Sequence, residues 1–182
     1  MRPGWKPKPL NWRVSLSETD FAEALGKLLT DGPLRDAFAR DPAGTAASLS
    51  HDRAVQSELV SLRMEDLEYQ AGVLLRKRFD AAKRLLPALF TRLGGEAWLI
   101  FRAYGRKRWL QGNEDALAFA DEIHRQSPDF LQAREMNRLR FTQVERRWRV
   151  HGIRLARFRP ALQVLYRRKS GTWRERVFFL RF

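Results

Sequence analysis

Residues 146–182 read RRWRVHGIRLARFRPALQVLYRRKSGTWRERVFFLRF, and along most of this stretch apolar side chains alternate with arginines in steps of two. This period is typical of β-strands, whose successive side chains point to opposite faces of a sheet. We expect three strands, over residues 148–158, 161–168 and 173–182, with the segment KSGT as the turn between the last two. The apolar positions change parity at Gly152, which predicts a β-bulge there.

The residues before this stretch repeat their apolar side chains every three or four positions, as amphipathic helices do. Helices are expected to begin after Asp41, which is followed by Pro42, and near Asp129, because an aspartate caps the free N–H groups of a first turn. Pro87 is expected to kink or split the long helical run of residues 52–93, since proline lacks a backbone donor and clashes with the preceding turn.

The sequence therefore predicts an α+β fold, with an N-terminal helical bundle followed by a small C-terminal antiparallel sheet of about three strands. An extended arm is expected over residues 1–16, which contain several prolines and basic residues. A helical domain should follow over residues 17–140, and the basic sheet over residues 141–182. No internal repeat is present.

Positive charge is concentrated in the C-terminal quarter of the chain. The net charge of the 182 residues is +14 at pH 7. From residue 137 onward fourteen Arg and Lys accompany two Glu, whereas the preceding residues carry twenty-one basic and nineteen acidic side chains. A nearly neutral body with a strongly cationic end indicates an anionic partner.

Several classes of protein are disfavoured by what the sequence lacks. There are no cysteines, and the three histidines, His51, His124 and His151, stand far apart without the spacing of a metal site. No catalytic motif is recognisable, so we expect neither an enzyme nor a cofactor bound to this chain. The N-terminus lacks an apolar run of signal-peptide length, and no segment approaches the roughly 20 apolar residues that cross a bilayer. We therefore expect a cytoplasmic protein without membrane attachment.

Two helical segments carry clusters of basic side chains, LLRKRFDAAKRLLPALFTRLG and YGRKRW. A basic helix face can simply be solvated, or it can dock a partner. For the second alternative, the candidate docking residues are Arg76, Lys77, Arg78, Arg84, Arg106 and Arg108.

The same region carries a recognisable pattern. It reads AGVLLRKRFDAAKRLLPALFTRLGGEAWLIFRAYGRKRW over residues 71–109 and GNEDALAFADEIHRQSP over residues 112–128. A helix with a K-R pair leads into L-P, a short helix ends in L-G, a helix bearing F and Y follows, and a last helix reads D-A-x-x-F. Residues 59–128 thereby resemble the accessory domain that accompanies multinuclear non-heme iron oxidases. These enzymes modify ribosomally made peptides, with methanobactin biosynthesis as the best-known example.

The resemblance implies a non-catalytic partner of such an oxidase, which recruits a precursor peptide by its leader. It also implies that the iron is held by the oxidase, and that the leader lies along a sheet. In this chain, the leader would lie along the strands expected over residues 148–158, 161–168 and 173–182.

A physical argument supports the same sheet as a peptide-binding site. The outer strands of a sheet leave backbone groups unpaired, and a peptide can satisfy them by adding as a further strand. Arginines favour an acidic leader through charge-assisted hydrogen bonds, and apolar side chains can anchor apolar leader residues. The candidate peptide-binding residues are Trp148, Arg154, Arg157, Arg167, Trp173, Arg174, Arg176, Phe178, Leu180 and Phe182.

The main alternative is nucleic-acid binding, because arginines and aromatic residues on a small sheet can hold phosphates and stack bases. A third possibility is a structural subunit whose basic sheet only docks an acidic partner. Membrane binding is disfavoured, because the basic residues alternate with apolar ones in a strand-like pattern instead of forming a cationic helix.

Overall fold

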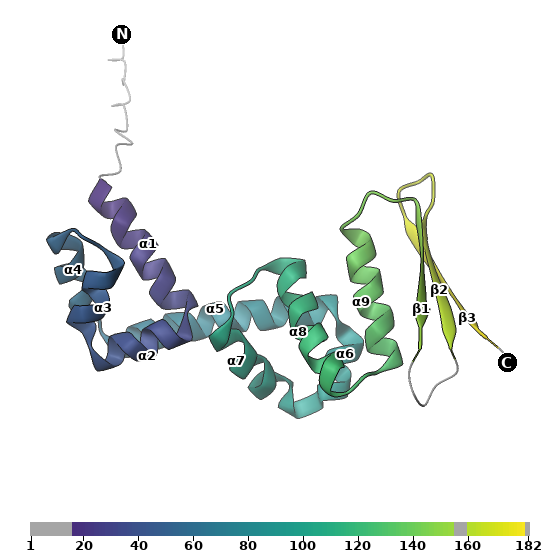
Figure 1. Ribbon diagram of the computed structural model, residues 1–182, viewed down its shortest axis with the longest axis horizontal. Helices are drawn as coiled ribbons and strands as arrows, with labels where there is room; N and C mark the ends of the chain where they lie inside the picture. Colours follow the sequence, from purple (N-terminus) through teal and green to yellow (C-terminus); the bar gives the residue numbers. More distant parts are fainter. Residues whose placement is uncertain (1–15, 155–159, 181–182) are drawn as a thin grey trace, which may run out of the picture. The chain divides into compact units, whose positions relative to one another are not determined.

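The computed structural model describes residues 16–154 and 160–180 (Figure 1). The expected arm lies outside these residues except for Leu16, and so do Arg157 and Phe182. Helices occupy the chain up to Thr142, and an antiparallel three-stranded sheet follows, which confirms the α+β fold predicted from the sequence. None of the described helices combines the length and the apolar character needed to cross a membrane.

The chain divides into two compact units, Met1–Gln70 and Ala71–Phe182, and the boundary falls inside helix α5 (Met64–Leu85). A division near residue 141, between helices and sheet, was expected instead. The difference arises because the sheet packs directly against the last helix, so that helices and sheet share the second unit.

The first unit is helical. Its elements are α1 (Leu16–Thr30), α2 (Gly32–Arg40), α3 (Pro42–Leu49), α4 (Arg53–Val60) and the beginning of α5. The Asp41 carboxylate accepts a hydrogen bond from the Gly44 N–H at 2.9 Å, and Pro42 lies in the first turn, which confirms the expected start of α3. Buried apolar residues from all these helices form one core: Ala24, Leu28, Phe38, Ala46, Val55, Leu59 and Leu67.

The second unit begins with the remainder of α5 and continues through α6 (Pro87–Leu93), a 3₁₀ turn (Gly94–Glu96), α7 (Ala97–Lys107), α8 (Gly112–Gln126) and α9 (Phe130–Thr142). Pro87 is the first residue of α6, which confirms that it splits the long helical run. The residue before α6 provides no side-chain cap. Instead, the Glu135 carboxylate of α9 accepts hydrogen bonds from the N–H groups of Ala88 and Leu89 at 2.8 and 3.0 Å.

Aromatic rings fill the centre of the helical part of this unit. Phe79 from α5 packs edge-on against Phe90 at 5.2 Å between ring centroids, and Phe101 packs edge-on against Phe119 at 5.0 Å. Such edge-to-face pairs are favourable beyond the area that they bury. The rings connect α5, α6, α7 and α8 in one apolar cluster.

A buried ion pair lies beside this cluster and connects three elements. The Arg78 guanidinium of α5 donates Nε and Nη2 hydrogen bonds to the two carboxylate oxygens of Asp115 in α8, at 2.8 and 2.7 Å. It also donates to the backbone oxygens of Gly105 and Arg108 at the end of α7, and it stacks on the Trp109 ring. Arg78 is therefore buried, and its assignment to an exposed docking face is wrong.

Helices α5 and α7 approach each other closely at Gly105. A Cβ atom at Gly105 would lie 2.3 Å from the Leu75 side chain, well inside van der Waals contact. The Gly105 carbonyl oxygen accepts a hydrogen bond from Arg78 Nη1 at 3.2 Å.

The sheet has the strand order β1-β2-β3, with β1 (Trp148–Ile153), β2 (Ala161–Arg167) and β3 (Trp173–Phe179). Both pairings are antiparallel, and the strands are shorter than expected. Gly171, at the β2–β3 turn, adopts a φ of 79°, which glycine tolerates without strain. The turn expected at KSGT is thus confirmed.

The β-bulge expected at Gly152 is absent. Gly152 pairs with Leu162 in a register that runs without interruption from Trp148 to Ile153. The apolar positions change parity because Trp148 and Val150 lie on one face of β1 and Ile153 on the other. Both faces of this strand carry apolar residues. The change of parity in the sequence therefore arises from apolar residues on two faces and does not indicate an interruption of the pairing.

Breaking the Arg78–Asp115 pair should destabilise the second unit strongly. Asp115→Ala leaves a buried guanidinium without its counter-charge, and we expect a loss of about 3 kcal/mol or more in the free energy of unfolding. Denaturant unfolding followed by tryptophan fluorescence measures it, since four of the six tryptophans, Trp98, Trp109, Trp148 and Trp173, lie in this unit. The matched control is Asp80→Ala, which breaks the exposed Arg76–Asp80 pair at 3.8 Å and should change stability by about 0.5 kcal/mol or less. Equal losses in the two variants would contradict the proposed role of Arg78.

Candidate functional site

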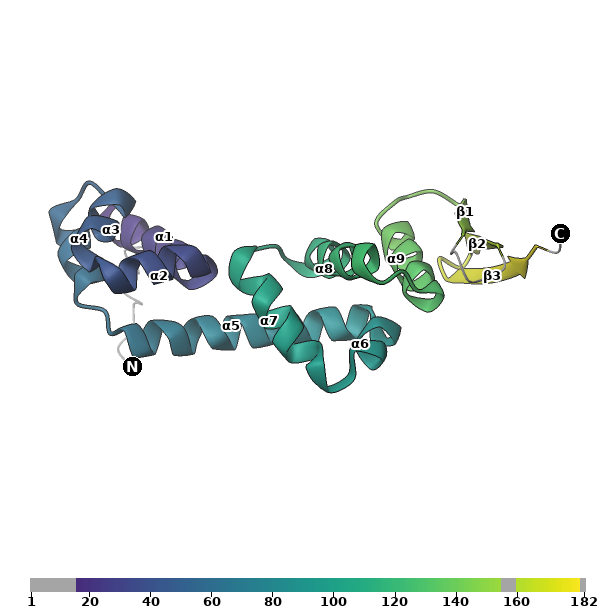
Figure 2. The same cartoon turned by 60° about the horizontal axis from the view of Figure 1, so that its bottom comes forward.

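One face of the sheet is covered by α9, which runs alongside it in both views (Figures 1 and 2). Gln163 of the central strand is fully buried there. Its side-chain oxygen accepts a hydrogen bond from the Asn137 amide at 3.0 Å, and its nitrogen donates to the Arg134 carbonyl and to the Glu175 carboxylate. Because all these groups are paired, the buried polar network fixes the position of α9 on the sheet.

Arginines of α9 complete the contact with β3. Arg134 donates to Glu175 at 2.8 Å, and the Arg138 guanidinium lies 4.8 Å from the centre of the Trp173 ring. Even so, Trp173 remains 37% exposed and Phe179 59% exposed. The covered face is therefore sealed along β2 and partly open along β3.

The other face of the sheet, called here the open face, packs against nothing among the described residues. It consists of Trp148, Val150, Gly152, Leu162, Val164, Tyr166, Arg174, Arg176 and Phe178. Trp148 is 67% exposed and Phe178 is 49% exposed. Exposed aromatic side chains grouped on one surface mark an interaction site more often than scattered ones do.

Charge and apolar area are separated on the open face. The register places Trp148, Tyr166 and Arg174 in one row across the strands, and Val150, Val164 and Arg176 in the next. The two arginines therefore line the outer strand β3 beside Phe178, while the open-face residues of β1 and β2 carry no charge. Neither Arg174 nor Arg176 has an ion-pair partner among the described residues, whereas Glu175 on the covered face is already bound to Arg134.

Both outer strands have a free edge, since within residues 16–154 and 160–180 no further strand pairs with β1 or β3. A shallow groove of about 530 Å³ follows the start of β1 and is lined by Arg146, Arg147, Trp148, Arg149 and Val150. Unpaired backbone groups along such edges are the usual template for an added strand.

The candidate peptide-binding residues divide among several places. Trp148, Arg174, Arg176 and Phe178 share the open face, as the alternation of the sequence predicted for β3. Trp173 lies on the covered face. Arg154 follows β1 and lines a small cavity with residues of α8 and α9, and the Leu180 N–H donates to the Pro160 carbonyl beyond β3. Arg157 and Phe182 lie outside the described residues.

Arg167 was also expected in the binding site, but it faces α9. Its guanidinium lies 5.6 Å from the centre of the Phe141 ring and donates to the Thr142 carbonyl at 3.3 Å. Arg167 therefore attaches β2 to the end of α9 and does not belong to the open face.

The basic residues considered for docking do not form one surface. Arg76 is exposed and stacks over the rings of Phe79 and Trp98, and Lys77 is exposed on the same helix. Arg84 borders a shallow groove beside Pro87 and Phe90. Arg106 is half-buried at the end of α7, and the exposed Arg108 borders a different groove between α7 and α8.

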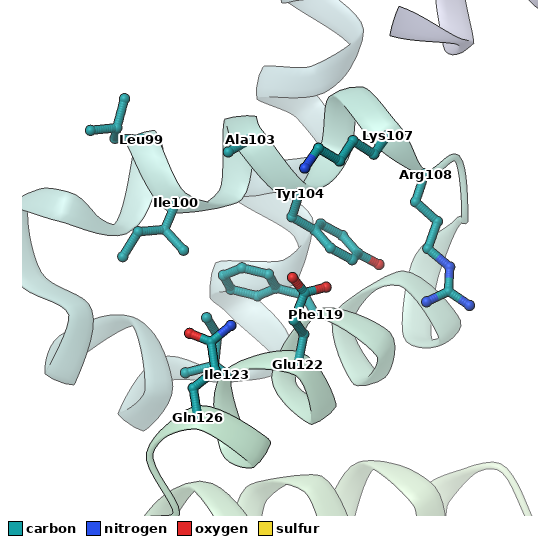
Figure 3. A pocket seen from close by; sticks show the side chains of 10 residues that line it. All are labelled: Leu99, Ile100, Ala103, Tyr104, Lys107, Arg108, Phe119, Glu122, Ile123 and Gln126. Carbon is teal, nitrogen blue, oxygen red and sulfur yellow. The ribbon is translucent and has the colours of Figure 1, made fainter. Parts of the chain in front are cut away.

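The groove between α7 and α8, called here the α7–α8 groove, encloses about 550 Å³ (Figure 3). Its residues are Leu99, Ile100, Ala103, Tyr104, Lys107 and Arg108 from α7, and Phe119, Glu122, Ile123 and Gln126 from α8. The residue patterns of the sequence did not predict this groove. The available signal was Leu99, an apolar residue outside the buried stripe of its helix, which the structure leaves 69% exposed.

Histidine and acidic side chains do not gather in groups of three or more that could hold a metal ion anywhere in the described part of the chain. No protein family, no curated protein and no solved structure matches the chain.

His151 of β1 lies on the covered face of the sheet. Its Nε2 atom is buried and has no hydrogen-bond partner among the described residues. Burial, and then the positive charges of Arg149 and Arg140, lower the pKa of this imidazole below its ordinary value. The folded state therefore favours the neutral form of His151.

The second unit should accordingly lose stability as the pH falls. Above the ordinary histidine pKa of about 6.5, His151 is neutral in both the folded and the unfolded state, and its contribution to stability is complete. As the pH falls below that value toward the lower pKa of the folded state, the unfolded state binds the proton more readily, and the free energy of unfolding decreases. In His151→Phe, the free energy of unfolding should depend less on pH across this window, as measured by denaturant unfolding at a series of pH values. His51→Asn, in the first unit, is the control. Identical pH dependence of His151→Phe and the unaltered protein would refute the interpretation.

Proposed function

We propose that the protein binds an extended acidic peptide as a fourth strand along the outer edge of β3. The observation that carries this proposal is the combination of a free β3 edge with Arg174, Arg176 and Phe178 on the open face. Hydrogen bonds between the two backbones provide affinity in this mode of recognition, and alternate side chains of the peptide provide selectivity.

The spacing of these side chains defines the peptide. Residues two apart in a strand lie about 6.7 Å from each other on the same face. A peptide strand beside β3 would therefore place alternate side chains next to Arg174, Arg176 and Phe178. Two acidic residues separated by one position, followed by an apolar residue two positions further along, are complementary to this row.

The β3 edge suits an added strand better than the β1 edge. An added strand beside β3 would bury exposed aromatic area on both faces, since Phe178 is exposed on the open face and Trp173 and Phe179 are exposed on the covered face. At β1, by contrast, Ile153 is already buried, and the exposed apolar side chains, Trp148 and Val150, lie on one face only. Removal of apolar area from water is the main driving force for such association.

We further propose that the bound peptide is the leader of a ribosomally made precursor, and that the protein is the non-catalytic partner of a multinuclear non-heme iron oxidase. This part of the proposal rests on the resemblance of residues 59–128 to the accessory domain of such enzymes. Holding the leader raises the effective concentration of the segment to be modified at the enzyme, which needs no chemistry from this chain. The iron would belong to the oxidase.

The double variant Arg174→Glu, Arg176→Glu should lose peptide binding. The probe is a fluorescein-labelled peptide in which two Glu and one Leu occupy three successive alternate positions, and fluorescence anisotropy measures its dissociation constant. We expect binding to weaken about tenfold or more, because two attractive charge pairs become repulsive. The control, Arg168→Glu with Lys169→Glu, makes the same change of charge at the β2–β3 turn, away from the β3 edge.

A second peptide separates strand addition from simple charge attraction. It has the same composition, but its two Glu are adjacent, so that they point to opposite faces of the added strand. It should bind distinctly more weakly to the unaltered protein. Equal affinity for both peptides, or equal losses in the two double variants, would show that the β3 edge does not recognise an extended peptide.

Nucleic-acid binding is the second candidate, and one observation favours it. Trp148 and Tyr166 are direct cross-strand neighbours on the open face, where two bases could stack. Phosphate contacts release counter-ions, so oligonucleotide affinity should fall steeply between low and moderate salt. If a single-stranded oligonucleotide binds with this dependence while neither peptide binds, the sheet is a nucleic-acid surface and the peptide proposal fails.

The oxidase partner is tested independently of the sheet. Genes for a multinuclear iron oxidase and for a short precursor peptide should lie beside the gene for this protein. If peptide binding is found but neither gene is present, the peptide-binding site at β3 is supported and the proposed oxidase partner is rejected.

A further inference from the structure

The α7–α8 groove is lined by residues of α7 and α8 and by none of the sheet. Its floor is apolar and is formed by Ile100 and Ala103 from α7 and by Phe119 and Ile123 from α8 (Figure 3). Leu99 stands at its border and is 69% exposed. An apolar hollow bordered by an exposed leucine is the kind of surface that buries a partner's apolar side chains.

One wall of the groove is held in place by buried polar contacts. The Tyr104 hydroxyl donates to the Asp115 carboxylate at 3.1 Å, and Asp115 is held by Arg78. Burial, and then the negative charge of Asp115, raise the pKa of the Tyr104 hydroxyl above its ordinary value, so that it stays protonated and keeps donating. The ring of Tyr104 is thus fixed as part of the groove wall, and a ligand need not order it.

The two sides of the groove differ in charge. Lys107 and Arg108 lie at the end of α7, whereas Glu122 and Gln126 rise from α8 on the opposite side (Figure 3). Lys107, Arg108 and Glu122 form no ion pair with any described residue. Helices that pack against each other often have an apolar strip with charged residues on both sides. The charges beside the strip determine which helix binds and in which orientation.

We propose that the α7–α8 groove binds an amphipathic helix of a partner protein, with acidic residues on one side of its apolar stripe and basic residues on the other. From Leu99 to Lys107 the groove follows α7 for about 12 Å, at a rise of about 1.5 Å per residue. Apolar residues at positions i, i+4 and i+7 of a helix span about the same length, so three anchors match the groove. The proposal does not depend on the function of the sheet.

The charges of the groove argue against other occupants. A fatty acid or another anionic amphiphile would meet Lys107 and Arg108, but it would also lie against Glu122 over the apolar floor. A second copy of this chain carries the same net charge of +14, and two such molecules repel each other. A helix with flanks of opposite charge satisfies both sides of the groove.

The experiment uses the whole protein and an 18-residue helical probe, about five turns long. The probe carries leucines in one stripe, glutamates on one flank and lysines on the other. A scrambled peptide of the same composition, in which the leucines form no stripe, is the control ligand. Backbone amide shifts in NMR spectra, followed to millimolar peptide, report binding at Ala103 and Ile123. The test variant is Leu99→Asp, and the matched control is Leu131→Asp, which changes an exposed leucine of α9 outside the groove.

We expect the striped probe to shift the amide resonances of the groove in the unaltered protein and in Leu131→Asp. In Leu99→Asp, binding of the probe should weaken about tenfold or more, because a charge is placed beside the apolar strip. Equal binding of the scrambled peptide, equal weakening by Leu131→Asp, or no shift at millimolar probe overturns the proposal. It is also overturned if decanoate alone produces the groove shifts. Concentration-dependent dimerisation that Leu99→Asp abolishes would assign the groove to a second copy and likewise reject the partner helix.

Discussion

The buried pair of Arg78 and Asp115 is the contact on which the rest of the second unit depends. The guanidinium binds both carboxylate oxygens of α8 and two carbonyl oxygens at the end of α7, so one side chain of α5 sets the positions of two further helices. A charge buried in this way requires all its partners, since removing one leaves an unpaired ion in an apolar surrounding. The same pair anchors Tyr104 and thereby shapes the wall of the α7–α8 groove.

Further buried polar side chains extend this arrangement from the helices to the sheet. Gln132 of α9 donates to the Ala120 carbonyl of α8 at 2.8 Å, and Gln163 of β2 connects α9 to two strands. Glu135 caps α6 from the same helix. Helix α9 is thus held on both sides, and it covers one face of the sheet. No other described element covers the second face, which is why its aromatic side chains remain exposed.

The two proposed surfaces would recognise different backbone conformations. An extended peptide beside β3 would be bound through backbone hydrogen bonds and the alternation of side chains, whereas a helix in the α7–α8 groove would be bound through an apolar stripe with charged flanks. Their separation within one unit suits a protein that brings a flexible peptide and a folded partner together. A catalytic group in this chain is not needed for such a role, because proximity alone raises the rate of encounter.

Local patterns in the sequence were sufficient for the α+β fold, for the helix start after Asp41 and for the interruption at Pro87. They also placed Arg174, Arg176 and Phe178 on one face, because strand and helix periods depend only on neighbouring residues. They could not show which face α9 would cover, so Arg167 was assigned to the wrong surface. Likewise, the sequence around Arg78 does not distinguish it from the other basic residues of an amphipathic helix. Its partner, Asp115, lies thirty-seven positions later in the chain. Burial and pairing are decided by contacts between segments distant in sequence, and only the tertiary structure brings those segments together.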